Sequence, residues 1–120
     1  MSEEGTVVVG LNKVMLIGCV GRNPEMRYVP TGRAVTSYSV AVHRDWMDAD
    51  GGRRDDTEWF NVVAWGELAE TCKSQLSEGM LVYVAGRLQT RTWQDSEGIQ
   101  CFCTEIVADE MIVLRETTEE

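Results

Sequence analysis

Apolar and polar residues alternate along several short stretches of the chain. In residues 34–43, Tyr38 and Val40 fall on one side, and Ser37 and Ser39 fall on the other. A period of two is typical of a β-strand with one buried face. We therefore expect strands at residues 6–21, 34–43, 57–65, 80–93 and 99–114.

One stretch has a different period. Leu68, Cys72 and Leu76 recur every four residues, which predicts a helix over residues 67–78 with Gly79 as its left-handed C-cap. The predicted order is three strands, one helix and two strands (β-β-β-α-β-β). This all-β order with one helix matches the five-stranded Greek-key barrel called the OB-fold. Another small β-barrel or an α+β sandwich is the alternative.

The predicted strands divide their side chains between a core and an outer face. Six apolar residues supply the expected core face: Phe60, Val62, Ala64, Val82, Val84 and Leu88. On the opposite face of the third strand lie Trp59, Asn61 and Trp65. Residues 45–56 are mostly polar and predict a hairpin loop that contains Trp46.

The net charge of the chain excludes one kind of binding surface. The 120 residues carry 11 basic and 20 acidic side chains, a formal net charge of −9. This balance excludes a diffuse basic coat for nucleic acid or anionic lipid. Five acidic residues lie near the ends, so the body of the chain is less acidic than the total. We expect a single domain at residues 12–115, an N-terminal extension at 1–11 that can add to the first strand, and a short acidic tail at 116–120.

Motifs for enzymes, metals and membranes are missing from the sequence. It contains no nucleophile elbow, phosphate-binding glycine loop or zinc-binding helix motif, so we expect no enzyme activity, no cofactor and no metal site. The four cysteines show no CxxC spacing and are expected to be reduced thiols. No apolar run reaches membrane-spanning length, and residues 1–5 lack the features of a signal peptide, so we expect a cytoplasmic protein.

Tryptophans and arginines are interleaved on the outer face of the predicted barrel. They are Trp59 and Trp65 on one strand, Arg87, Arg91 and Trp93 on another, and Arg44 and Trp46 at the mouth of a loop. Exposed aromatic rings favour a flat ligand, and neighbouring arginines favour an anionic one. Single-stranded nucleic acid has both properties. The alternative is an aromatic face that docks protein, as in an OB-fold interaction subunit of a replication-restart-type assembly.

Several segments, taken in order, resemble a known family. They read NKVMLIG at 12–18, GRNPEMRY at 21–28, PTG at 30–32, TEWFNVVAWG at 57–66, LAE at 68–70 and GRLQTRTW at 86–93. The family is that of the bacterial single-stranded DNA-binding proteins, and the resemblance covers nearly the whole chain. It implies an OB-fold that binds single-stranded DNA in replication, recombination and repair, is associated with the nucleoid, and forms a homotetramer, with a homodimer as the alternative.

The resemblance also assigns roles to residues. The family's base-stacking positions match Trp46, Trp59, Trp93 and, in place of a phenylalanine, Trp65. Its phosphate-binding positions match Lys13, Arg27 and Arg91, and we expect Arg44 and Arg87 to add to them. An interface tyrosine matches Tyr83, and Phe60 is a second candidate contact between subunits. The family's acidic tail tip with Pro and Phe has no match, so recruitment of repair proteins is not implied.

Overall fold

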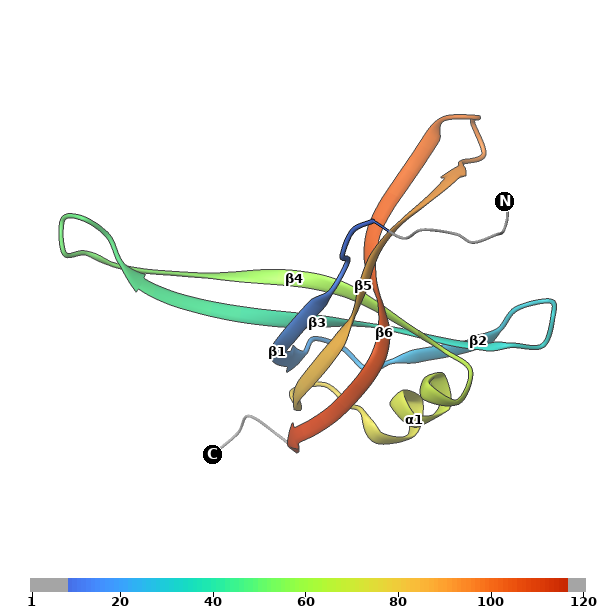
Figure 1. Ribbon diagram of the computed structural model, residues 1–120, viewed down its shortest axis with the longest axis horizontal. Helices are drawn as coiled ribbons and strands as arrows, with labels where there is room; N and C mark the ends of the chain where they lie inside the picture. Colours follow the sequence, from blue (N-terminus) through green and yellow to red (C-terminus); the bar gives the residue numbers. More distant parts are fainter. Residues whose placement is uncertain (1–8, 117–120) are drawn as a thin grey trace.

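The described part of the chain contains six strands and one helix. The computed structural model describes residues 9–116 (Figure 1). The elements are β1 (Val14–Val20), β2 (Glu25–Tyr28), β3 (Ala34–Met47), β4 (Arg53–Trp65), α1 (Glu67–Gln75), β5 (Leu81–Gln94) and β6 (Gln100–Arg115). The first eight residues of the predicted extension and the last four of the predicted tail lie outside the described range.

Five of the strands close into a barrel. The strand order is β1-β5-β6-β4-β3-β2, and a further pairing of β1 with β3 closes the ring. Only β4 and β6 pair in parallel, at Val62↔Ile106 and Val63↔Val107. The predicted five-stranded barrel with one helix is therefore confirmed.

The barrel interior contains the predicted apolar side chains with one exception. Val62, Ala64, Val82 and Val84 are fully buried, and Phe60 packs against them while partly exposed. Leu88 was expected in the core, but 46% of its surface is exposed. It lies at the rim of the barrel, where the core ends.

Helix α1 follows β4 in the chain and packs against β3, β4 and β6. Ala69 and Cys72 are its buried residues, and the hydroxyl of Thr36 on β3 donates a hydrogen bond to the carbonyl of Ala69 at 2.7 Å. The helix ends at Gln75, earlier than predicted. Gly79 has the expected positive φ of 93°, but it lies in the turn after the helix and not at its C-cap.

The strand boundaries differ from the prediction in three places. β1 begins at Val14, so residues 9–13 are not part of it. The four-residue strand β2 was not predicted, because its residues face solvent and show no apolar alternation. The predicted loop at 45–56 is mostly strand, and the true connection is residues 48–52.

Two hairpin arms project from the barrel (Figure 1). In the β3–β4 arm, residues 42–47 pair with residues 53–58. In the β5–β6 arm, residues 90–94 pair with residues 100–104. The radius of gyration is 17.5 Å, whereas a compact domain of this length has roughly 14 Å. The arms therefore extend the surface well beyond the barrel.

A β-bulge and a close backbone contact lie near the base of the β5–β6 arm. β6 has one extra residue, Asp109, opposite the Ala85–Gly86 bond, and a Cβ at Gly86 would collide with the carbonyl of Val107. Near this point the carboxamide of Asn12 both donates to the carbonyl and accepts from the amide of Leu88, each at 2.9 Å. The Asn12 side chain thus takes the place of a backbone partner on that edge of β5.

Three hairpins are closed by loops of one kind. The residue that begins each loop shares backbone hydrogen bonds with the third and fourth residues after it: Val29 with Gly32 and Arg33, Asp48 with Gly51 and Gly52, and Asp95 with Gly98 and Ile99. Gly32, Gly51 and Gly98 all have φ between 81° and 94°. This left-handed conformation favours glycine, which explains its position in each loop.

Candidate nucleic-acid interface

Strand β4 presents an aromatic row on the face opposite the core. Because side chains alternate along a strand, Trp59, Asn61 and Trp65 share this face while Val62 and Ala64 point inward. The Trp59 side chain is 60% exposed. The predicted placement of these three residues on one outer face is confirmed by the alternation of burial along β4.

Gly21 lies in close contact with the ring of Trp59. A Cβ at Gly21 would collide with ring atoms of Trp59 and with the hydroxyl of Ser39. Gly21 also donates its amide to the carbonyl of Ser39 at 2.9 Å. The six-membered ring of the Trp59 indole therefore lies close to the backbone of Gly21, and most of the side chain remains exposed for stacking.

The β5–β6 arm carries a second aromatic position. The guanidinium carbon of Arg91 lies 4.9 Å from the ring centre of Trp93, at the distance of a cation–π contact. Arg91 also reaches the carboxylate of Glu105, with Nε 3.4 Å from Oε2. Arg91 is thereby held between a ring and a carboxylate.

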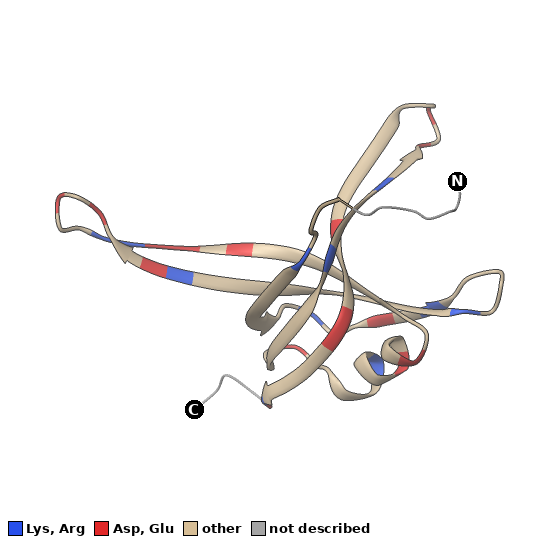
Figure 2. Cartoon of the chain, in the orientation of Figure 1, with Lys and Arg blue, Asp and Glu red and all other residues tan. Residues whose placement is uncertain are grey.

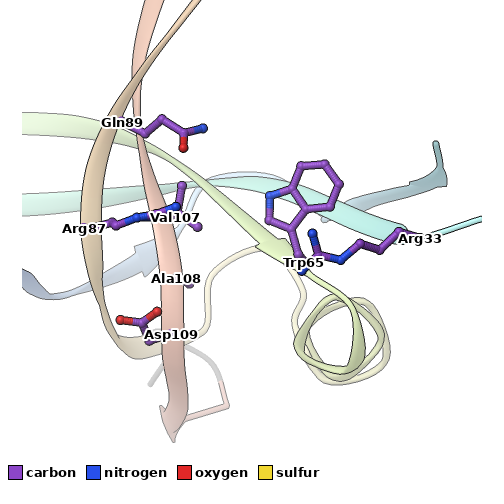
Figure 3. Close-up of a pocket in the computed structure, with 7 residues that line it drawn as sticks. All are labelled: Arg33, Trp65, Arg87, Gln89, Val107, Ala108 and Asp109. Atoms are coloured by element: carbon purple, nitrogen blue, oxygen red, sulfur yellow. The ribbon is translucent and has the colours of Figure 1, made fainter. Parts of the chain in front are cut away.

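Two hollows lie between β4 and the strands β5 and β6. The first, of about 470 Å³, is lined by Arg33, Trp65, Arg87, Gln89, Val107, Ala108 and Asp109 (Figure 3). In it the guanidinium carbon of Arg33 lies 4.9 Å from the ring centre of Trp65. The second, of about 390 Å³, shares Trp65 and Gln89 with the first, and its lining includes Arg22, Arg27, Asn61, Arg91, Cys103 and Glu105. The two hollows adjoin at Trp65 and Gln89, and we call them together the groove.

The groove gathers three of the five predicted basic residues. Arg27, Arg87 and Arg91 line it. Arg22 and Arg33 line it as well but were not predicted. Both lie outside strands, so alternation could not place them, although each stands next to a turn glycine, which was a usable signal.

Two predicted phosphate contacts lie outside the groove lining. Arg44 is on the β3–β4 arm, where its guanidinium carbon lies 4.3 Å from the ring centre of Trp46 and its Nε lies 3.8 Å from Asp56. Acidic and basic positions are mixed along this arm (Figure 2). Lys13 is exposed just before β1.

Trp46 is separated from the other three tryptophans. By alternation along β3 it shares a face with Val40 and Val42, opposite the face of the arm that carries Trp59. It remains partly exposed, so it offers a ring to a ligand that follows the arm outward.

An apolar patch covers the outer face of β1, β5 and β6. Ile17, Tyr83 and Ile112 lie opposite one another across the three strands. Met15 and Leu114, also exposed, extend the row, and we call these five residues the outer patch. Phe60 does not belong to it, because it lies on β4 and packs against the core.

Several other reactive side chains lie outside the groove lining. All four cysteines are free, and burial raises the pKa of the Cys72 thiol beside the hydroxyl of Tyr38, whose pKa burial also raises. Within residues 9–116, ligand atoms of His43, Asp45 and Asp55 lie within 4.8 Å of one another, all exposed. Exposed acidic groups often gather without an ion, so this cluster alone assigns no metal.

The described residues include no helix with the length and apolar character needed to cross a membrane.

Comparison with known proteins identifies relatives of this chain. It is 44% identical over 106 residues to single-stranded DNA-binding protein 1 of Chlorobaculum tepidum, covering 88% of this chain and 65% of that protein. It is 46% identical to the single-stranded DNA-binding protein of Neisseria meningitidis serogroup A, covering 88% of this chain and 61% of that protein. These names describe DNA-binding proteins and not enzymes, in agreement with the prediction. The chain spans less than two thirds of the length of these curated relatives.

Solved structures give the same result for the fold. A Plasmodium falciparum SSB in complex with ssDNA superposes with a TM-score of 0.82 at 30% identity, covering 91% of this chain and 99% of that one. A deletion mutant of the single-stranded DNA-binding protein from Thermus aquaticus superposes with a TM-score of 0.78 at 31% identity, covering 88% of this chain and 51% of that one. The barrel is therefore an OB-fold, as predicted. Because the family model for single-strand binding proteins also matches residues 11–114, the chain belongs to the single-strand binding protein family.

Proposed function

We propose that this chain binds single-stranded DNA without sequence specificity and acts in DNA replication, recombination and repair. The observation that carries the proposal is the exposed ring of Trp59, supported on Gly21 at one side of a groove lined by arginines. Bases stack on such rings, and phosphates pair with such arginines. The expected site of action is the nucleoid, where single strands arise.

Stacking accounts for the lack of sequence specificity. Each base stacked on an aromatic ring contributes about 1 to 3 kcal/mol, and every base has a π-face. Trp59, Trp65 and Trp93 lie at the groove, and Trp46 offers a further ring on the other face of the β3–β4 arm. Duplex DNA keeps its bases stacked inside the helix, so it cannot use these rings.

Titration of tryptophan fluorescence with dT oligomers tests this function. We expect quenching on addition of single-stranded dT and no comparable change with duplex DNA. Trp59→Ala and Trp93→Ala should each weaken binding by about 1 to 3 kcal/mol. No fluorescence change, together with no shift of a dT oligomer on a gel at moderate salt, would overturn the proposal and favour a protein-docking role.

We also propose that the outer patch joins copies of this chain into a homotetramer. Ile17, Tyr83 and Ile112 form a contiguous apolar row across three strands, and Met15 and Leu114 extend it. A contiguous exposed apolar surface of this kind favours burial against another chain. The outer patch and the groove use different stretches of β5 and β6: the patch uses Tyr83, Ile112 and Leu114, and the groove uses residues within 87–91 and 103–109. The arrangement therefore leaves the groove free.

A further inference from the structure

A carboxylate lies buried within the proposed DNA groove. The side chain of Glu105 on β6 is only 5% exposed, yet it lines the hollow that also holds Arg22, Arg27 and Arg91. A buried charge interacts with its neighbours more strongly than a solvated one, because less water screens it. Glu105 is thus a fixed negative charge at the place where DNA phosphates are expected.

Glu105 is paired with one arginine in particular. Its Oε2 lies 3.4 Å from Nε of Arg91, and its Oε1 lies 3.5 Å from Nη2. Both oxygens therefore face the same guanidinium, side by side. Within residues 9–116, no other hydrogen bond or ion pair is recorded for this carboxylate.

Arg91 remains accessible to a ligand on its other side. Its side chain is 54% exposed, and its guanidinium lies over the ring of Trp93. The guanidinium is thus held in place by Glu105 and Trp93 together. Its positive charge is already offset by Glu105 before any DNA arrives.

We propose that Glu105 is a positioning residue that holds Arg91 against Trp93 and offsets its charge, so that the groove binds DNA with weak salt dependence. This inference rests on the proposed single-stranded DNA binding. Arg91 then contributes by orienting the Trp93 ring and by hydrogen bonding to DNA. Because its charge is already offset, its contact with DNA releases few counterions. The other groove arginines supply most of the salt-dependent attraction.

Removal of this charge changes the salt dependence in a defined direction. For a protein that binds single strands, the slope of log K against log salt becomes more negative by about 0.7 for each phosphate that the protein neutralises. With the four groove arginines other than Arg91 each neutralising one phosphate, the wild-type slope is about −3. Glu105→Gln frees Arg91 to neutralise one more phosphate, so we expect the slope to become steeper by about 0.7. The affinity for a dT oligomer at low salt should rise by about threefold to tenfold, as expected for a charge within several ångströms of a phosphate.

Variants of two arginines provide an independent comparison. The double variant Arg91→Gln/Glu105→Gln should keep nearly the wild-type slope, because the two charges that it removes offset each other. Arg87→Gln should make the slope shallower by about 0.7, because within residues 9–116 no ion pair is recorded for Arg87, which lines the adjoining hollow. Arg91→Gln alone leaves the buried Glu105 charge unpaired and should weaken binding. These variants test the proposal even if Glu105→Gln proves unstable.

The controls separate charge from structure. Glu105→Asp keeps the charge and should keep the wild-type slope, and Glu116→Gln removes an exposed charge beyond the end of β6 and should change nothing. An unchanged slope in Glu105→Gln, or a slope in the double variant as shallow as that in Arg87→Gln, overturns this inference. If the wild-type chain binds no dT oligomer at all, it is the proposed function that fails.

Discussion

At the scale of single residues, the interface depends on contacts that fix the aromatic rings. Trp59 rests on Gly21, Trp65 lies under Arg33, and Trp93 lies under Arg91. A ring that is already oriented loses less freedom when a base stacks on it. The tryptophans and Arg91 could be predicted from the sequence by strand alternation, but Gly21 and Arg33 could not, because they come from segments distant in the chain from the rings that they contact.

Gly21 provides a test of this support. Gly21→Ala places a methyl group where the Trp59 ring now lies, so we expect the ring to move and the affinity for dT oligomers to fall. The loss should approach that of Trp59→Ala, about 1 to 3 kcal/mol, with altered tryptophan fluorescence in the free protein. Gly52→Ala is the matched control, since its added carbon meets only ordinary contacts with Asp48. Equal affinity of Gly21→Ala and wild type would contradict the role of Gly21.

At the scale of elements, the arms show where sequence patterns stop being informative. Inside the barrel one face of each strand is buried, so alternation predicted Val62 and Val82 correctly. In the β3–β4 arm both faces meet solvent, and polar residues such as Asp55 and Asp56 occur where the pattern predicts a loop. The arm is strand because its backbone pairs continuously from Val42↔Glu58 to Met47↔Arg53.

The loop of the β3–β4 arm should depend on pH. The pKa of Asp48 is lowered, first by the hydrogen bond from Arg54 and then by the amides of Gly52 and Asp50. A carboxylate with a lowered folded-state pKa stabilises its loop fully above the unfolded value of about 3.9, and this contribution is lost as pH falls through the folded value.

NMR titration of the Gly52 amide measures this transition. We expect its chemical shift to move with a midpoint below 3.9, the usual carboxyl value. Arg54→Gln removes the largest cause and should raise the midpoint toward that value. Arg53→Gln is the control, because Arg53 contacts Asp45 and not Asp48. A midpoint that Arg54→Gln leaves in place would contradict the assigned cause.

At the scale of the whole molecule, we propose different roles for two parts of the barrel surface. The groove collects arginines although the chain has a net charge of −9, so the local distribution of charge matters more than the total. The outer patch lies farther along β5 and β6, at Tyr83, Ile112 and Leu114. The family resemblance matched Tyr83 to an interface position, and only the strand register shows that Ile17 and Ile112 lie beside it.

Disruption of the outer patch should change the assembly. Ile17 is 56% exposed and lies next to Tyr83 in the patch, so Ile17→Asp places a charge in the proposed interface. We expect light scattering to report a smaller assembly than for wild type. Phe102→Asp is the control: Phe102 is also exposed and apolar, but it lies on the β5–β6 arm. An unchanged mass for Ile17→Asp would contradict the proposed interface.

The pairing of the Asn12 carboxamide with Leu88 has a consequence for solubility. Where a strand projects alone, its free edge offers backbone donors and acceptors that a strand from another molecule can extend into an aggregate. Asn12 occupies both groups at the first such position of β5, immediately beyond its pairing with β1. The Asn12 side chain thereby occupies the backbone groups of β5 at the base of the projecting arm. A strand from another molecule cannot begin to pair with β5 at this position.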